Sequence, residues 1–258
     1  MTLAGRGAVI TGGGRGIGAA TARALAAGGA QILVASRHEA EVEAIAAQVR
    51  QSGAEAWAVR CDVADPQSTA ALARAAGERL GTVDILVNNA GTASSAPLHR
   101  TSLEEWQRLL AVNATGTFLC TQALLPGMLE RGWGRVVNVA SVAGLEGAKY
   151  IAAYCAAKHA VVGFTRAMAI ETAGTGVTVN AVCPGYVDTP MTDTTLGLVA
   201  ERMRKSRAEA LQAILAHSGQ PRLVTADEVA ATILALCDDA AAALTGQTLV
   251  LDAGAVRT

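Results

Sequence analysis

The stretch that decides the fold of this 258-residue chain is Gly7-Ala8-Val9-Ile10-Thr11-Gly12-Gly13-Gly14-Arg15-Gly16-Ile17-Gly18. An apolar strand over residues 7–10 runs into a glycine-rich turn, and a helix is predicted over residues 19–27. The glycines permit a tight turn, and free N–H groups at the helix start favour a pyrophosphate. The spacing Gly-x-x-x-Gly-x-Gly differs from the common Gly-x-Gly-x-x-Gly, yet its place between strand and helix predicts a dinucleotide cradle. Its candidate cofactor contacts are Gly12, Arg15, Gly16, Ile17 and Gly18.

Outward from this turn, apolar strands alternate with helices along the whole chain. Hydrophobic residues make up 51% of the sequence and aromatic residues only 3%, which suits buried parallel strands of Ala, Val, Leu and Ile. The pattern predicts a single α/β domain over residues 1–258, a Rossmann-type, doubly wound parallel sheet of seven strands flanked by helices. The predicted strands cover residues 7–10, 31–35, 55–63, 83–87, 134–140, 177–182 and 247–251.

A small helical substrate lid is predicted over residues 189–222, after the sixth strand. Its sequence carries four basic side chains, Arg202, Arg204, Lys205 and Arg207. A solvated helix face explains these charges as well as a contact with substrate does, so both interpretations stand.

Ligands of such sheets bind at the carboxyl ends of the strands. The second strand ends at Ser36 and Arg37, where an acidic residue would hold the ribose 2′-hydroxyl of NAD and a basic one accommodates the 2′-phosphate of NADP. Together with Arg15 from the glycine turn, they favour NADP(H), with NAD(H) as the alternative. Glu39 and Glu41 argue against this choice, but they also fit the first turn of a surface helix.

Other strand ends add candidate contacts. Asp62 and Val63 follow the third strand, where they suit an adenine pocket, although Asp62 is equally explained as a turn residue before Pro66. The small residues after the fourth strand, Asn89, Ala90 and Gly91, let a cofactor pass the strand end. The helical stretch 103–130 is interrupted at residues 112–116, and an asparagine and a glycine in mid-helix indicate a kink with a functional cause at Asn113.

The candidate catalytic groups are Ser141, Tyr154 and Lys158. Residues four apart on a helix project from one face, so the Tyr154 phenol and the Lys158 ammonium can share a site. A neighbouring cation favours the phenolate and lowers the pKa of a tyrosine. Ser141 closes the fifth strand, from which its hydroxyl can reach the same substrate oxygen. Alone, a Tyr-x-x-x-Lys pair is common by chance and a serine is more often a cap, but together they suit proton transfer beside a hydride acceptor.

Charge and cysteine content exclude several classes of protein. A net charge of −1 and a pI near 6.4 give no electrostatic case for nucleic acid or an anionic membrane surface. The five cysteines are widely spaced without a Cys-x-x-Cys pair, and we expect reduced, mostly buried thiols and no metal. No run of 18 apolar residues and no secretory-type start occurs, so we expect a soluble cytoplasmic protein.

These motifs resemble the short-chain dehydrogenase/reductase family over essentially the whole chain. The resemblance implies that Tyr154 is the general acid/base, that Ser141 orients the substrate carbonyl and that Lys158 lowers the tyrosine pKa and binds the nicotinamide ribose. It implies a water held by Asn113, and a homotetramer built through helices 103–130 and 152–172. Further implied cofactor contacts are Tyr154, Lys158, Pro184, Gly185, Val187 and Thr189. The matching motifs are Thr11-Gly12-x-x-x-Gly16-x-Gly18, Asn88-Asn89-Ala90-Gly91, Asn113, Ser141, Tyr154-x-x-x-Lys158 and Pro184-Gly185.

Within the family, the chain looks like 3-oxoacyl thioester reductases and polyketide ketoreductases and, less closely, like 3-hydroxybutyrate dehydrogenases. The latter hold a substrate carboxylate with polar residues where this chain has Ala93, Ser94, Ala143 and Ile151. We therefore expect a bulkier or uncharged ketone/alcohol substrate, with a thioester on a coenzyme A or carrier-protein arm as one form. The alternatives are an NAD-dependent secondary alcohol or hydroxy acid dehydrogenase, and a catalytically silent nucleotide-binding subunit.

Overall fold

The predicted strands form one parallel sheet in the order β3-β2-β1-β4-β5-β6-β7. The computed structural model describes residues 3–255. Chain order reverses between β1 and β4, the switch point at which ligands of open α/β sheets bind. The strands are β1 (Gly7–Thr11), β2 (Gln31–Ser36), β3 (Ala56–Arg60), β4 (Ile85–Asn88), β5 (Gly134–Val139), β6 (Val177–Pro184) and β7 (Thr248–Leu251).

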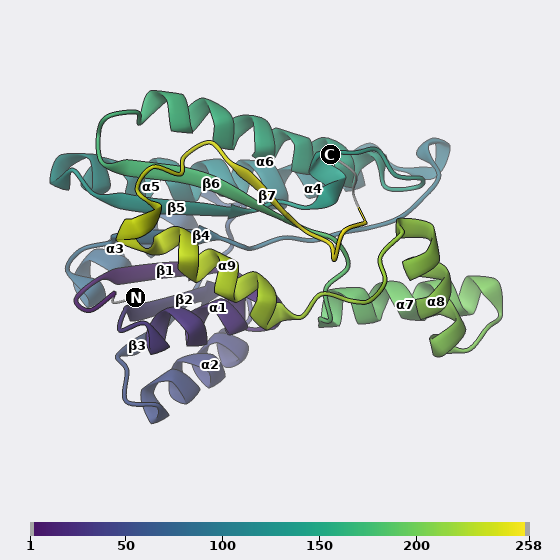
Figure 1. The fold of residues 1–258 in the computed structure, drawn as a ribbon, viewed down its shortest axis with the longest axis horizontal. Helices are drawn as coiled ribbons and strands as arrows, with labels where there is room; N and C mark the ends of the chain where they lie inside the picture. The colour runs from purple at the N-terminus through teal and green to yellow at the C-terminus, as the bar shows by residue number, and fades with distance from the viewer. Residues whose placement is uncertain (1–2, 256–258) are drawn as a thin grey trace.

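Helices cover both faces of this sheet (Figure 1). One face packs against α1 (Gly16–Ala27), α2 (Glu39–Gln51) and α9 (Ala226–Cys237). The other packs against α3 (Pro66–Leu80), α5 (Gly116–Arg131) and α6 (Ala152–Glu171), with α4 (Leu103–Leu110) leading into α5. The predicted doubly wound α/β architecture is thus confirmed.

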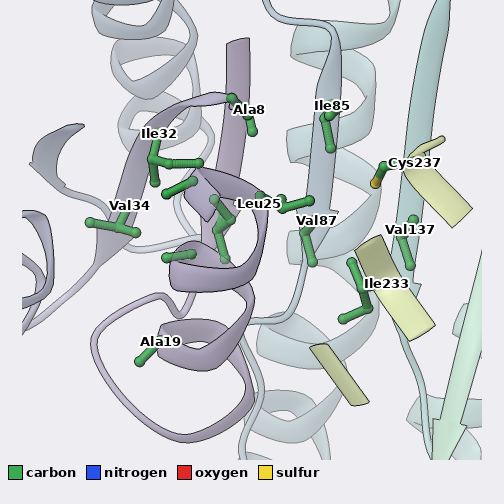
Figure 2. Packing of buried hydrophobic residues seen from close by; sticks show 14 of the residues in the cluster. Ala8, Ala19, Leu25, Ile32, Val34, Ile85, Val87, Val137, Ile233 and Cys237 are labelled. Atoms are coloured by element: carbon green, nitrogen blue, oxygen red, sulfur yellow. The ribbon is translucent and has the colours of Figure 1, made fainter. Parts of the chain in front are cut away.

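Small aliphatic side chains fill the layer beneath α1 and α9 (Figure 2). Leu25 of α1 and Ile233 of α9 are fully buried and lie against the strands at the centre of the sheet. Burying one such side chain stabilises a fold by about 1.5–3 kcal/mol. Many buried aliphatic side chains therefore supply the hydrophobic stabilisation of this core, which contains few aromatic residues. The helix α9 begins at a capping box formed by Thr225 and Glu228, a pattern that the run Thr225-Ala226-Asp227-Glu228 indicates in the sequence itself.

The interrupted helix also agrees with the prediction. Between α4 and α5 lies a π-helical turn, Ala111–Thr115, that contains Asn113. Several element bounds differ from expectation, and the two largest differences are at α1 and β3. The helix α1 begins at Gly16, three residues before the expected Ala19, and β3 ends at Arg60 because Asp62 accepts a hydrogen bond from the Ala64 amide in a turn.

The predicted lid consists of two helices beyond the carboxyl end of the sheet, α7 (Pro190–Met203) and α8 (Arg207–Ser218) (Figure 1). Leu196, Ala210 and Ile214 form a small core between them. Arg207 pairs with Asp193 of the neighbouring helix, and the Arg202 guanidinium reaches the Ser95 carbonyl at 3.5 Å. Two of the four basic side chains therefore have partners within the protein.

One helical stretch in the described residues, Leu103–Arg131, is long and apolar enough to span a membrane by length and composition, with a mean hydropathy of 1.3. Its apolar side includes Cys120, Leu124, Leu125 and Met128, which are buried in the core against the sheet. This burial accounts for the hydropathy of the stretch.

Candidate active site

The glycine turn and the end of β4 are joined by side-chain hydrogen bonds. The Asn89 amide donates to the carbonyl oxygens of Thr11 at 3.0 Å and Gly12 at 2.9 Å. In return, the Thr11 hydroxyl accepts hydrogen bonds from the backbone amides of Asn89 and Ala90, each at 3.1 Å. Asn89 therefore holds the turn in place from the neighbouring strand.

The turn leaves no room for side chains at several of its glycines, as two of them show. Gly12 has a φ of +64°, and a Cβ there would lie 2.8 Å from the Ala90 Cα. A Cβ at Gly18 would lie only 2.3 Å from the Gly12 carbonyl oxygen. Because real side chains do not approach this closely, the turn and the first residues of α1 pack directly on each other.

The start of α1 has the features of an anion site. Arg15 occupies the N-cap position in an extended conformation, and its side chain makes no capping hydrogen bond. The first N–H groups of the helix therefore point toward the turn without a side-chain acceptor, at the positive end of the helix dipole. A dinucleotide pyrophosphate fits this cradle.

A cleft follows from this turn along the carboxyl ends of the strands. Most of the predicted cofactor contacts line it, from the glycine turn to the lid. Its wall also contains residues that were not predicted, Gly14, His38, Glu41, Cys61, Val112, Pro190 and Met191. The predicted residues in the wall are Gly12, Arg15, Gly16, Ile17, Ser36, Arg37, Asp62, Val63, Asn89, Ala90, Gly91 and Thr189.

Six predicted cofactor contacts lie outside this wall, among them Tyr154 and Lys158, which are described below. Gly18 is buried beneath the turn, and Val187 is a buried core residue whose strand segment bridges to Val224. Pro184 ends β6, and the Gly185 amide donates to the Leu251 carbonyl at 3.0 Å. Thr189, which does line the wall, also caps α7. A Cβ at Gly16 would lie 3.1 Å from the Thr189 methyl group, so the lid starts directly over the glycine turn.

The candidate catalytic side chains come from β5 and α6. Ser141 follows β5, and its hydroxyl caps the short 3-10 turn Val142–Gly144. Ser141 therefore has the capping role that is common for a serine, in addition to its place beside Tyr154. Its hydroxyl hydrogen-bonds Tyr154 and donates a long 3.4 Å bond to the Pro184 carbonyl. Lys158, only 4% exposed, donates a 2.8 Å hydrogen bond to the Val139 carbonyl and lies 5.8 Å from the Tyr154 ring centre.

Burial dominates the protonation of these groups. It raises the pKa of Tyr154 to about 12, and the hydrogen bond with Ser141 opposes this increase. Burial also lowers the pKa of Lys158 to about 8, against the effect of Cys183. The Lys158 ammonium is directed to the Val139 carbonyl. The lowered tyrosine pKa expected from the sequence is therefore not found in the protein alone.

Asn113 lies beside these groups with its amide fully engaged. Its nitrogen donates to the carbonyls of Thr92 at 2.8 Å and Leu109 at 2.9 Å, and its oxygen accepts from the Thr92 amide at 3.2 Å. A Cβ at Gly91 would lie 2.9 Å from this oxygen and 3.6 Å from the Lys158 nitrogen. The π-helical turn thus places Asn113 where it fixes the loop after β4 next to Lys158.

Sequence reasoning missed the group that connects this site to the lid. Tyr186 is close enough to raise the Tyr154 pKa, and its ring packs on the small core of the lid. Gln220, at the far end of the lid, accepts a 2.7 Å bond from the Tyr186 amide and donates a 3.2 Å bond to its carbonyl. Since the two residues are 34 positions apart, no local sequence signal could have paired them.

All five cysteines are free and buried, as expected.

The parallel sheet, the glycine cradle and the cleft at the strand ends define a Rossmann-type dinucleotide-binding fold. The family model described as short chain dehydrogenase matches residues 6–196. The chain belongs to the short-chain dehydrogenase/reductase family, a family of oxidoreductases, as its motifs predict.

Similar proteins include a 3-oxoacyl-[acyl-carrier-protein] reductase from Synechocystis sp., 43% identical, with 96% of each chain covered. A putative ketoacyl reductase from Streptomyces coelicolor is 41% identical, with 94% of each chain covered. Among solved structures, an actinorhodin polyketide ketoreductase with NADPH superposes with a TM-score of 0.93 at 40% identity, covering 97% of both chains.

Proposed function

We propose that this protein is an NADP(H)-dependent oxidoreductase that interconverts a ketone and a secondary alcohol, with a 3-oxoacyl thioester or another bulky ketone as substrate. The observation that carries the proposal is the convergence of Ser141, Tyr154 and Lys158 beside the glycine-lined cleft. The NADPH in the similar polyketide ketoreductase, and Arg15 and Arg37 in the cleft wall, support the choice of cofactor. When bound, that cofactor supplies or accepts the hydride.

In the reductive direction, the proton comes from Tyr154. Its raised pKa keeps the phenol protonated near neutral pH, which suits a donor to the stronger base that develops on the substrate oxygen. Ser141 exchanges its long bond to the Pro184 carbonyl for a hydrogen bond to the same oxygen. The Lys158 ammonium then stabilises the phenolate, and solvent returns the proton. In oxidation, the phenolate accepts the alcohol proton.

Exposed apolar residues at the cleft and on the segments leading to the site support a bulky apolar substrate. Leu98, Tyr150 and Met191 are large exposed apolar residues, and Met191 also lines the cleft. The Tyr150 carbonyl accepts a hydrogen bond from the Ala96 amide at 2.8 Å, which joins the loop after β4 to the segment that leads to Tyr154. The names of the similar reductases support an acyl thioester in this place.

The same proposal includes a cytoplasmic homotetramer, as the family resemblance implies. Exposed apolar side chains on α5 and α6 support it. Phe118 contacts Phe164 edge to face with ring centres 6.3 Å apart, and Ile170 is 79% exposed. Light scattering coupled to gel filtration tests the subunit number, and a monomer at micromolar concentration would contradict this part.

The test of the activity is initial-rate cofactor consumption with NADPH and NADH in parallel, over 3-oxoacyl thioesters, free 3-oxo acids, and neutral aryl or cyclic ketones. Turnover with NADPH on thioesters or bulky ketones is expected. Turnover confined to NADH and free 3-oxo acids would contradict the proposal.

A further inference from the structure

The ribose end of the cleft contains a negative charge that a site for NADP(H) does not need. Glu41 lies in the cleft wall, and its carboxylate is 3.8 Å from the Arg15 guanidinium, measured from Oε1 to Nη1. The wall contains two guanidiniums, those of Arg15 and Arg37. The Arg15 guanidinium is already paired with Glu41 within the protein.

The position of Glu41 is fixed by packing. A Cβ at Gly14 would lie 2.8 Å from the Glu41 Cβ and 3.1 Å from its Oε2. The first turn of α2 therefore rests on the glycine turn, with the carboxylate beside it. Ser36 and His38 also line the cleft, and the Ser36 hydroxyl both accepts from the His38 amide and donates to its carbonyl, at 3.1 Å each. The packing against Gly14 and the ion pair with Arg15 keep Glu41 near any group bound between Arg15 and Arg37.

We propose that Glu41 is a cofactor-specificity residue, whose carboxylate competes with a 2′-phosphate for Arg15 and so weakens the preference of this enzyme for NADPH over NADH. The inference rests on the proposed binding of a dinucleotide in this cleft. A doubly charged phosphate must draw Arg15 away from Glu41 and tolerate the carboxylate nearby, whereas a ribose hydroxyl meets neither cost. The ion pair is partly exposed, with side chains 63% and 38% accessible, so the effect is modest.

The test is direct binding of NADPH and NADH, followed by quenching of intrinsic fluorescence, with no substrate present. The Glu41→Gln variant is expected to bind NADPH about 3- to 10-fold more tightly and NADH with less than a twofold change. Glu39→Gln is the matched control, because Glu39 lies in the same helical turn and is exposed outside the cleft wall. It is expected to change neither affinity by twofold.

A double-mutant cycle identifies the mechanism. In the Arg15→Gln background, Glu41→Gln is expected to lose most of its effect on NADPH, because the competition for Arg15 no longer exists. Weaker NADH binding by Glu41→Gln would show that the carboxylate holds the ribose hydroxyl and would overturn the proposal. An unchanged NADPH affinity would show a solvated helix residue and would also overturn it. If the unaltered protein binds neither nucleotide, the proposed function itself fails, and this assignment with it.

Discussion

The ammonium nitrogen of Lys158 lies 2.8 Å from the carbonyl oxygen of Val139, the last residue of β5. This hydrogen bond ties the helix that carries Tyr154 to the strand end that leads into Ser141. The buried charge therefore has a structural partner in the protein, and it lies beside Gly91, which lines the cleft.

Replacing Lys158 by methionine is expected to change how stability depends on pH. Burial lowers the pKa of Lys158 from 10.5 to about 8, so between these values the unfolded chain binds more protons at this residue than the folded chain. Its contribution to the unfolding free energy therefore rises with pH across this window and is constant below it. Urea unfolding from pH 7 to 10 should show the wild type gaining stability relative to Lys158→Met. The difference in unfolding free energy between the two proteins cancels the titration of the groups that they share. If the two plots of unfolding free energy against pH run parallel, the lowered pKa of Lys158 is contradicted.

A methyl group at Gly91 is expected to disturb the active site. It would lie 2.9 Å from the Asn113 oxygen, whose amide cannot yield without losing its hydrogen bonds. We expect Gly91→Ala to destabilise the fold by about 1–3 kcal/mol and to lower kcat. Gly77→Ala in α3 is the matched control, because nothing lies within 4 Å of its added Cβ. The control is expected to stabilise by up to about 1 kcal/mol. Equal stability of the two variants in urea would refute the close packing.

Removing the Gln220 side chain should loosen the connection between the site and the lid. Gln220 is 4% exposed and bonds both backbone groups of Tyr186. Since Gln220→Ala leaves buried polar groups unpaired, we expect a loss of about 2–4 kcal/mol in unfolding free energy and a higher KM. Gln212→Ala, on the exposed side of α8, should cost less than about 0.5 kcal/mol. A Gln220→Ala protein as stable as this control contradicts the clamp.

Tyr150 provides a separate test of the substrate rim. Its φ of +69° is unfavourable for a residue with a side chain, and its ring is 58% exposed. Tyr150→Gly relieves this strain but adds freedom to the unfolded chain, so we expect a stability change within about 1 kcal/mol. The KM for bulky ketones should rise several-fold, with kcat little changed. Tyr150→Ala, which keeps the strain and lacks the ring, should show the same KM and lower stability than Tyr150→Gly. An unchanged KM in both variants would remove Tyr150 from the rim.

The features predicted from sequence are those set by short stretches of chain. The glycine turn at Gly12 and Gly18, the π-helical turn at Asn113 and the capping box at Thr225 each follow from a few neighbouring residues. The parallel, doubly wound arrangement of the strands follows from their regular alternation with helices, because crossovers between parallel strands have one hand.

What the sequence could not supply depends on contacts between distant segments. Gln220 reaches Tyr186 only after the lid has folded, and Glu41 meets Arg15 because α2 packs on the glycine turn. The expectation of a lowered Tyr154 pKa was wrong for a similar reason. The spacing from Lys158 was visible, but the burial that dominates the pKa and the Val139 carbonyl that holds the ammonium were not.

The most direct test of the central claim is turnover by Tyr154→Phe with NADPH and the best ketone of the substrate panel. The phenyl ring keeps the packing but carries no proton, so we expect kcat to fall by about 10²- to 10⁴-fold while the NADPH dissociation constant stays within twofold. Such a result would establish Tyr154 as the proton donor of a ketone reductase. Unchanged turnover would contradict this role and would favour a nucleotide-binding subunit without catalysis at this site.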